Sequence, residues 1–222
     1  MTEEVLYLDR VLWPVTALGP GNRVALWVSG CRRRCLGCAN PELWERRPGQ
    51  KILVSKAADF LDRIWREKNP EGLTITGGEP FDQAGGLAKV LECSKASWGD
   101  VLIYTGYKRE ELLRDPYRKA LLLKADVLID GPYIEERNNP SAVLRGSENQ
   151  RIFFRDAQTE KRYRKYMEEG RQIQNFVYDY QILSVGIHQR GERLSAEAEA
   201  GRPSGQTESG RNRRWENEGG QK

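Results

Sequence analysis

The sequence predicts an α/β protein whose central sheet is largely parallel, and two observations lead to this prediction. Short segments rich in strand formers alternate at least three times with segments of helical periodicity, which is typical of parallel strands joined by helical crossovers. The chain has 222 residues, of which 38% are hydrophobic and 31% charged, so it is long enough for one domain with a real core. In such a sheet, ligands bind beyond the carboxyl ends of the strands.

The expected strands are short apolar runs bounded by turn residues. The first, over 5–13, is rich in strand formers, and a turn at 19–22 separates it from a buried strand over 23–28. Further strands are expected over 73–76, 101–105, 127–130 and 151–154, followed by a hairpin over 176–187. The loops after 28 and 76 therefore lie at the carboxyl edge of the predicted sheet.

The expected helices lie mostly between these strands. Ser55 is placed to cap a helix with Phe60, Leu61 and Ile64 on one face, and Pro70 stops it. Apolar spacing around Leu87 indicates a second helix. The segment 110–123 is expected to be largely helical, and 158–169 to be a charged, exposed helix.

Three segments are expected along the chain. Residues 1–155 form the main domain, 156–190 a C-terminal helix and hairpin extension, and 191–222 a tail. The tail is dominated by glycine, serine, glutamate and arginine. Such a composition does not bury enough apolar surface to offset its ordering entropy, so the tail is predicted to be disordered.

Composition excludes several classes of protein. The mean hydropathy is −0.71, and no apolar run approaches the ~20 residues that cross a bilayer, so we expect no membrane protein. The first ten residues lack the pattern of a secretory signal, which predicts a cytoplasmic location. The net charge of +4 is too small to indicate nucleic-acid binding.

The cysteines carry the strongest chemical signal. Cys31, Cys35 and Cys38 form a C-x3-C-x2-C run within eight residues, whereas Cys93 stands alone. Clustered thiols in a chain without a signal peptide indicate metal ligation. Three thiolates on one loop can hold three irons of a [4Fe-4S] cluster and leave the fourth iron open. The alternative is a zinc site, which needs Cys93 or His188, the single histidine, as its fourth ligand.

A glycine-rich loop follows the expected strand over 73–76. It reads Gly77-Gly78-Glu79-Pro80, and glycines let the backbone approach a ligand closely. Together with the cysteine spacing, this loop resembles the radical S-adenosylmethionine enzymes. The resemblance implies an incomplete parallel (β/α) barrel, one [4Fe-4S] cluster, and a glycine loop that holds the methionine ammonium group of S-adenosylmethionine.

A narrower resemblance covers roughly residues 5–155. The sequence is similar there to the activating proteins of anaerobic ribonucleoside-triphosphate reductase, with matching pieces in the same order: 21–31, 37–40, Trp44, 104–107, 126–132 and 145–150. Between the first two cysteines that family usually carries a histidine, and this chain carries Arg33. The extension beyond residue 155 also departs from the family.

The resemblance assigns residues to the site. It implies Cys31, Cys35 and Cys38 as cluster ligands, and S-adenosylmethionine contacts at these positions: Gly37, Ala39, Gly77, Gly78, Glu79 and Asp130. From its place at a strand end, Asp130 is suited to contact the cofactor ribose or a cation, or to cap the next turn.

The resemblance also implies an activity and partners. The reduced cluster would cleave S-adenosylmethionine to a 5′-deoxyadenosyl radical, which would generate a glycyl radical on the partner reductase, with a flavodoxin- or ferredoxin-type protein as electron donor. Two alternatives stay open. One is a stand-alone radical enzyme that modifies another protein, a peptide or a small molecule. The other is a metal-stabilised binding module without catalytic activity. We interpret the run Arg32-Arg33-Arg34 as a solvated loop face, or as a docking patch for an acidic electron donor.

Overall fold

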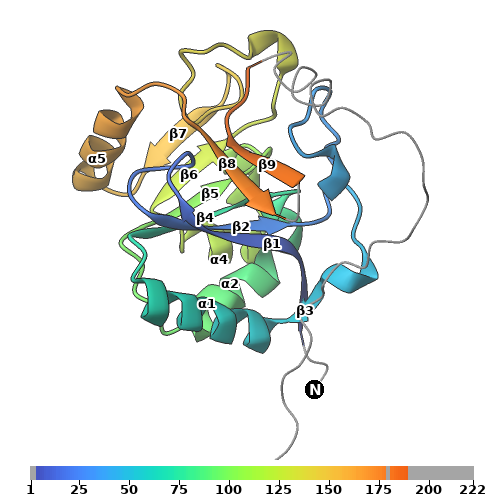
Figure 1. Cartoon of the computed structure of the whole chain (residues 1–222). Coiled ribbons are helices and arrows are strands. Elements are labelled where there is room, and N and C mark those ends of the chain that lie inside the picture. The colour runs from blue at the N-terminus through green and yellow to red at the C-terminus, as the bar shows by residue number, and fades with distance from the viewer. Residues whose placement is uncertain (1–3, 179–180, 190–222) are drawn as a thin grey trace, which may run out of the picture. The chain divides into compact units, whose positions relative to one another are not determined.

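A seven-stranded mixed sheet organises the computed structural model, which describes residues 4–178 and 181–189. The strand order is β3-β1-β2-β4-β5-β6-β7, and a separate two-stranded sheet is formed by β8 and β9 (Figure 1). All described residues belong to one unit, Met1–Arg190. The predicted α/β class with a largely parallel central sheet is confirmed. The predicted disordered tail over 191–222 lies outside the described residues.

Four neighbouring strands at the centre of the sheet are parallel. They are β2 (Arg23–Val28), β4 (Gly72–Gly77), β5 (Val101–Tyr104) and β6 (Val127–Asp130). Each pairs in parallel with the next in that order. β2 is buried at every position, as expected for a central strand covered on both faces. The carboxyl ends of all four strands therefore meet at one edge of the sheet.

Antiparallel strands complete both sides of the sheet. β1 (Val5–Val15) pairs with β2 on one side and with β3 (Lys51–Leu53) on the other. β7 (Arg151–Phe154) pairs antiparallel with β6. The short strand β3 was not predicted from the sequence, because three residues give too little periodicity to recognise.

Three helices pack on one face of the sheet. They are α1 (Val54–Lys68), α2 (Ala84–Cys93) and α4 (Pro116–Leu122), which lie below the sheet in Figure 1. Alternate residues of β2 point into the core between the sheet and these helices. Ala25 and Trp27 point to the opposite face of the sheet. The central sheet thus has apolar side chains on both faces.

The sequence expectation that Ser55 caps the first helix was wrong. The residue before the first turn of α1 is Leu53, without a side-chain cap, so Ser55 lies inside the helix and does not cap it. The segment 110–123 is largely helical, as expected, and consists of two helices, α3 (Arg109–Leu112) and α4. The chain breaks there because Pro116 begins a helix well but does not continue one, and Asp115 caps the new helix through the N–H of Arg118.

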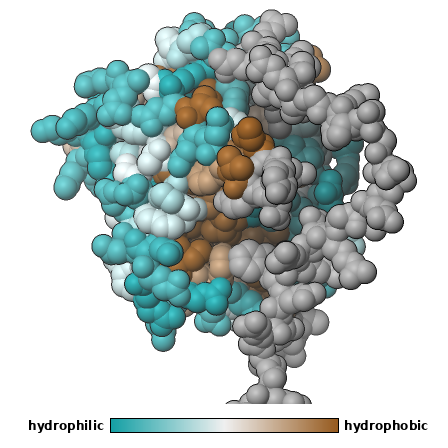
Figure 2. All heavy atoms as spheres, in the orientation of Figure 1, coloured by the Kyte–Doolittle hydropathy of each residue, from teal (hydrophilic) through white to brown (hydrophobic). Residues whose placement is uncertain are grey.

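The C-terminal extension covers the other face. It consists of α5 (Ala157–Met167) and the antiparallel hairpin of β8 (Ile173–Tyr178) and β9 (Gln181–Gly186). Val185 of the hairpin is buried against Trp27 and its neighbours. Apolar side chains gather around the hairpin on this face of the molecule (Figure 2).

Short 3-10 helices occupy the loops: η1 (Pro41–Leu43), η2 (Pro48–Gln50), η3 (Pro80–Gln83) and η4 (Glu135–Arg137). Within the described residues, no helix combines the length and apolar character needed to cross a membrane.

Candidate iron–sulfur and cofactor site

The two loops that the sequence singled out leave adjacent strands at the same edge. The cysteine loop follows β2, and the glycine loop follows β4, its parallel neighbour. Beyond the last ladder pair, Gly78 donates its N–H to Val28 O at 2.7 Å, and Glu79 donates to Gly30 O at 2.9 Å. Main-chain hydrogen bonds therefore join the glycine loop directly to the residue before Cys31.

The glycine pair is needed for this close approach. Gly77 has φ of +108°, and a Cβ there would lie 2.4 Å from Val28 O. A Cβ on Gly78 would lie 2.4 Å from Gly30 O. Backbone atoms at such distances leave no room for a side chain, so both glycines let β2 and β4 continue side by side beyond the sheet. Contact of this pair with S-adenosylmethionine stays a prediction.

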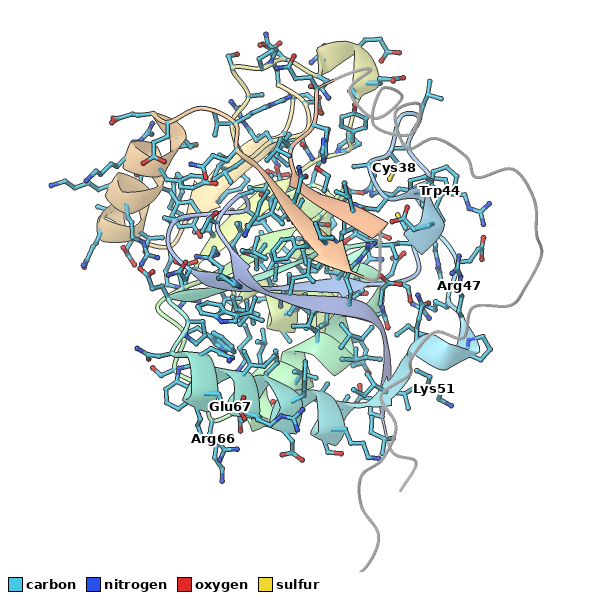
Figure 3. All side chains as sticks on the ribbon, viewed as in Figure 1. Cys38, Trp44, Arg47, Lys51, Arg66 and Glu67 are labelled. Atoms are coloured by element: carbon cyan, nitrogen blue, oxygen red, sulfur yellow. The ribbon has the colours of Figure 1, made fainter. Side chains whose placement is uncertain are left out.

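The cysteine loop is closed by main-chain hydrogen bonds. Cys31 donates to Trp44 O at 2.9 Å, and Cys38 donates to Cys35 O at 3.2 Å. All three cysteines are half-buried. Figure 3 shows Cys38 and Trp44 near each other, far from Glu67 on α1. The loop thus keeps its three thiols on one short segment at the carboxyl edge.

The surroundings of the thiols suit iron ligation. Burial raises the pKa of Cys31, while the N–H groups of Arg33 and Arg34 oppose that rise. Burial also raises the pKa of Cys38, against the N–H of Asn40, which lies 3.4 Å from Cys38 Sγ. N–H donors that point at sulfur stabilise the thiolate form that binds iron. The residues present therefore fit an iron–sulfur cluster.

The zinc alternative receives no support from the position of Cys93. Cys93 ends α2, which starts after the glycine loop and returns to the amino end of β5. It is exposed there, at the edge of the sheet opposite the cysteine loop. Among the described residues, no three His, Cys, Asp or Glu side chains converge as they would on a single metal ion. A cubane differs in this respect, because each thiolate binds a different iron.

Glu79 is fully buried and joins two loops. Its carboxylate accepts hydrogen bonds from Phe81 N at 3.0 Å, Thr105 Oγ1 at 2.7 Å and Gly106 N at 2.8 Å. Burial raises its pKa to about 7, although each of these bonds acts in the opposite direction. In this arrangement Glu79 ties the glycine loop to the loop that follows β5.

Asp130 is also buried, and protein donors occupy both of its carboxylate oxygens. Arg109 donates its main-chain N–H to Oδ2, and Arg151 bonds to both oxygens, with Nε 2.9 Å from Oδ1. The contact of Asp130 with Arg109, the first residue of α3, was not among the roles that the sequence predicted for it. Gly37 and Ala39 are exposed on the cysteine loop. Their contacts with a cofactor, like that of Asp130, stay predictions.

Sequence reasoning missed the position of Arg33. The run Arg32-Arg33-Arg34 was interpreted as a solvated face, and this holds for Arg32 and Arg34, which are exposed. The Arg33 guanidinium instead stacks on the ring of Tyr107, 4.3 Å from the centroid. No signal in the sequence separates the middle arginine from its neighbours, since the contact depends on the loop after β5.

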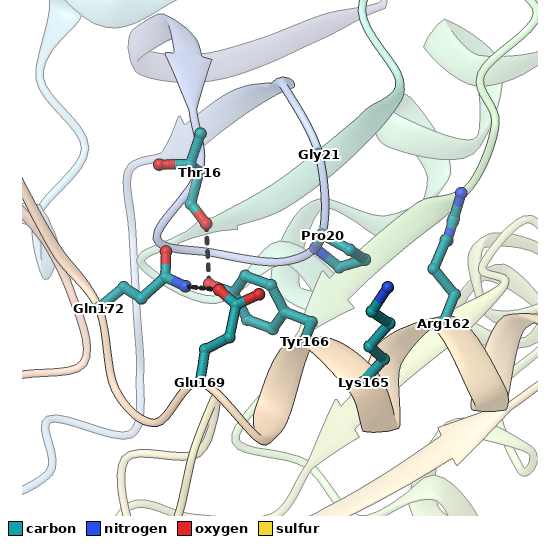
Figure 4. Close-up of a pocket in the computed structure, with 8 residues that line it drawn as sticks. All are labelled: Thr16, Pro20, Gly21, Arg162, Lys165, Tyr166, Glu169 and Gln172. Carbon is teal, nitrogen blue, oxygen red and sulfur yellow. Dashed lines mark hydrogen bonds between the residues drawn. The ribbon is translucent and has the colours of Figure 1, made fainter.

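A cavity of about 260 Å³ lies elsewhere, between α5 and the turn that precedes β2 (Figure 4). Arg162 and Lys165 of α5, with Glu169 just after the helix, line it on one side, and Pro20 and Gly21 on the other. It lies toward the amino ends of the strands and includes none of the predicted site residues.

Known proteins resemble this chain in the same region. Residues 17–153 match the family described as a 4Fe-4S single cluster domain. The anaerobic ribonucleoside-triphosphate reductase-activating protein of Enterobacteria phage T4 is 35% identical over 140 residues, covering 61% of this chain and 85% of the relative. The protein of that name from Vibrio cholerae is 38% identical over 144 residues (60% and 88%), and that from Escherichia coli K12 is 33% identical over 141 residues (60% and 88%).

The family match shows that the chain, with its three-cysteine loop, contains a 4Fe-4S single cluster domain. It belongs to the family of anaerobic ribonucleoside-triphosphate reductase-activating proteins. The resemblance inferred from the cysteine and glycine motifs is thereby confirmed. The matched residues end at 153, so α5, β8 and β9 lie outside the family match.

Proposed function

We propose that this chain is an iron–sulfur enzyme that cleaves S-adenosylmethionine reductively and generates a glycyl radical on an anaerobic ribonucleoside-triphosphate reductase. One observation carries the proposal. In a member of the activating-protein family, the glycine loop after β4 is hydrogen-bonded to the start of the three-cysteine loop, through Glu79 N and Gly30 O. The glycine loop and the cysteine loop therefore lie side by side and can serve one site.

Cys31, Cys35 and Cys38 would hold the [4Fe-4S] cluster, and the iron without a thiolate would be available to the amino and carboxylate groups of the cofactor. Once bound and reduced, the cluster would supply one electron to S-adenosylmethionine, giving methionine and a 5′-deoxyadenosyl radical that would abstract hydrogen from a glycine. The protein's part is to fix the thiols and to shape the cofactor space beside them.

The proposed cofactor contacts all lie on strand ends or loops at the carboxyl edge: Gly37, Ala39, Gly77, Gly78, Glu79 and Asp130. Glu79 and Asp130 bind donors from neighbouring loops, so we propose that they also hold these loops in place around the cofactor. The remaining boundaries stay proposals too: 1–155 as the catalytic domain, 156–190 as an extension, and 191–222 as a tail.

We also propose that the sheet is the incomplete parallel barrel of radical enzymes. Four adjacent parallel strands, with helices on their outer face and both motifs at one edge, support this assignment. The proposed reaction needs free thiols and a low-potential reductant. This favours the cytoplasm as location and a flavodoxin- or ferredoxin-type protein as electron donor.

The experiment is anaerobic reconstitution with iron and sulfide, followed by measurement of 5′-deoxyadenosine from S-adenosylmethionine and a chemical reductant. The wild-type chain should form 5′-deoxyadenosine, and Cys35→Ala should form none. Absence of product from a chain that holds its cluster would refute the proposed cleavage.

One observation keeps a second function in view. Helix α5 and the hairpin lie outside the matched residues and cover one face of the sheet, so they could select a different partner. Formation of 5′-deoxyadenosine without a glycyl radical on the reductase would assign the chain to a stand-alone radical enzyme instead.

A further inference from the structure

Arg33 occupies an unusual position on the cysteine loop. It lies between Cys31 and Cys35, and its main-chain N–H contacts the Cys31 thiol. Its side chain leaves the loop and reaches the segment after β5, where the guanidinium stacks on Tyr107 at 4.3 Å. Nη2 is 3.7 Å from Glu111 Oε2. One residue thus connects two cluster ligands to the neighbouring loop.

The place of the guanidinium is closely fixed. The Tyr107 hydroxyl donates to Asp82 Oδ1 at 2.7 Å, and the guanidinium of Arg118 stacks on the same ring at 4.0 Å. A Cβ on Gly106 would lie 2.3 Å from Arg33 Cδ, so only glycine leaves room for the arginine stem. The ring that receives Arg33 is therefore held from several sides.

Burial separates Arg33 from its neighbour Arg34. The Arg33 side chain is 23% exposed, and its Nε is buried with no hydrogen-bond partner in the part of the chain that the structure describes. Arg34 is 57% exposed and pairs with Glu45, which is 71% exposed. Charges act more strongly on their surroundings where solvent is excluded. Of the two arginines, Arg33 is better placed to act on a group held by the cysteines.

We propose that Arg33 holds a positive charge on the loop adjacent to the cysteine loop and thereby raises the reduction potential of the cluster. One-electron reduction makes the cluster more negative, and a fixed cation nearby stabilises the reduced form. Net charge and hydrogen bonding around a cluster are established determinants of its potential. The inference rests on the proposed function, because it requires that the three cysteines hold a [4Fe-4S] cluster.

Glu111 faces Arg33, and removing its negative charge should shift the cluster potential in the direction opposite to removing the arginine charge. Its carboxylate partly offsets the arginine charge, and it is 46% exposed, so its substitution is compatible with folding. In Glu111→Gln the remaining amide oxygen can still accept the N–H of Lys108, which the carboxylate accepts at 2.6 Å. The variant therefore removes a negative charge and keeps the helix start.

The experiment measures the midpoint potential of the reconstituted cluster by anaerobic redox titration, monitored by EPR without S-adenosylmethionine. Arg33→Gln removes the buried charge, Arg34→Gln removes an exposed charge from the same loop as a matched control, and Arg33→Lys restores a charge at the site. Iron and sulfide content is measured for each variant. A wild-type chain that binds no cluster would contradict the proposed function itself.

We expect Arg33→Gln to shift the potential to more negative values, Arg34→Gln to leave it unchanged and Arg33→Lys to return it toward wild type. Glu111→Gln should shift it to more positive values, while Glu45→Gln, which removes the partner of Arg34, should not. If Arg33→Gln holds no cluster, the comparison of Glu111→Gln with Glu45→Gln still tests the inference. Equal potentials in wild type, Arg33→Gln and Glu111→Gln, or equal shifts from Arg33→Gln and Arg34→Gln, would overturn the inference.

Discussion

The cysteines of the site are held in place by their main chain, whereas their proposed role depends on their side chains. Cys31 and Cys38 are placed by backbone hydrogen bonds to Trp44 and Cys35, so their positions depend on the loop as a whole. The proposed ligation of iron, by contrast, would use only their thiols. Substitution of a thiol therefore tests ligation with little effect on the fold.

Cys35→Ala should abolish cluster assembly, because it removes one of three proposed ligands. Cys93→Ala is the matched control: it removes an exposed thiol at the opposite edge of the sheet and should leave the cluster intact. Iron and sulfide analysis after anaerobic reconstitution measures both. Wild-type iron content in Cys35→Ala, or loss of iron in Cys93→Ala, would show that the ligands are assigned incorrectly.

Glu79 should make the stability of the cluster-free chain depend on pH. Its pKa is about 7 in the folded chain and near 4.5 when unfolded, so between these values the folded state binds more protons. The contribution of Glu79 to stability is thus fully present below about pH 4.5 and is lost as the pH rises to about 7. The shift corresponds to roughly 3 kcal/mol.

Urea denaturation at several pH values between 5 and 7 measures this dependence. The free energy of unfolding should fall with rising pH in the wild type and fall less steeply in Glu79→Gln, which cannot titrate. Identical slopes in the two proteins would mean that Glu79 is ionised throughout this range.

At the scale of elements, the site depends on the junction of β2 and β4. Parallel pairing brings Val28 opposite Gly77, and the next hydrogen bonds continue into both functional loops. The backbones approach so closely at Gly78 that even a methyl group collides with Gly30 O. The junction therefore transmits any change in the glycine loop to the start of the cysteine loop.

Gly78→Ala should destabilise the fold by about 1–3 kcal/mol, because the added Cβ forces the two main chains apart. It should also reduce cluster assembly. Gly85→Ala is the control: it adds the same methyl group in α2, where the nearest atoms are 3.5 Å away, and should stabilise by ~0.5–1 kcal/mol. Denaturation and iron content report both effects, and equal stability of the two variants would contradict the role of the junction.

Much of this arrangement was predictable from the sequence because it depends on local patterns. The apolar runs at 23–28 and 127–130 indicated buried strands, and the cysteine spacing indicated an iron–sulfur protein, as the family match shows. Both motifs were placed correctly at the carboxyl edge, since parallel strands end on the same side.

What could not be predicted depends on contacts between distant residues. The three donors that surround Glu79 come from two loops, and the stacking of Arg33 on Tyr107 joins residues 74 positions apart in the chain. Nothing in the local sequence distinguishes Arg33 from Arg34. Ser55 shows the opposite case: a residue typical of helix caps lies within the first turn, because the helix already begins at Val54.

At the scale of the whole molecule, a buried ionic network joins the extension to the sheet. Arg23 at the start of β2 is fully buried, with Nη2 2.6 Å from Asp100 Oδ1. From α5, the Tyr163 hydroxyl donates to the same oxygen at 2.7 Å, and Arg162 pairs with the other. The extension outside the family match therefore shares a buried charge pair with the central sheet.

Asp100→Asn should destabilise the chain by about 3–5 kcal/mol, because it leaves the buried Arg23 charge without its counter-ion. Arg162→Gln removes a second partner of the same carboxylate, but its side chain is 41% exposed, so the cost should stay below ~1 kcal/mol. Thermal or urea denaturation compares them. Similar losses in both variants would show that the two pairs contribute equally.

The most direct test of the proposed activity is the EPR spectrum of an anaerobic ribonucleoside-triphosphate reductase incubated with the reconstituted chain, S-adenosylmethionine and a low-potential reductant. The account predicts a glycyl radical signal on the reductase that requires all of these components and disappears when Cys35→Ala replaces the wild-type chain. Absence of the signal, from a chain that holds its cluster and forms 5′-deoxyadenosine, would contradict it.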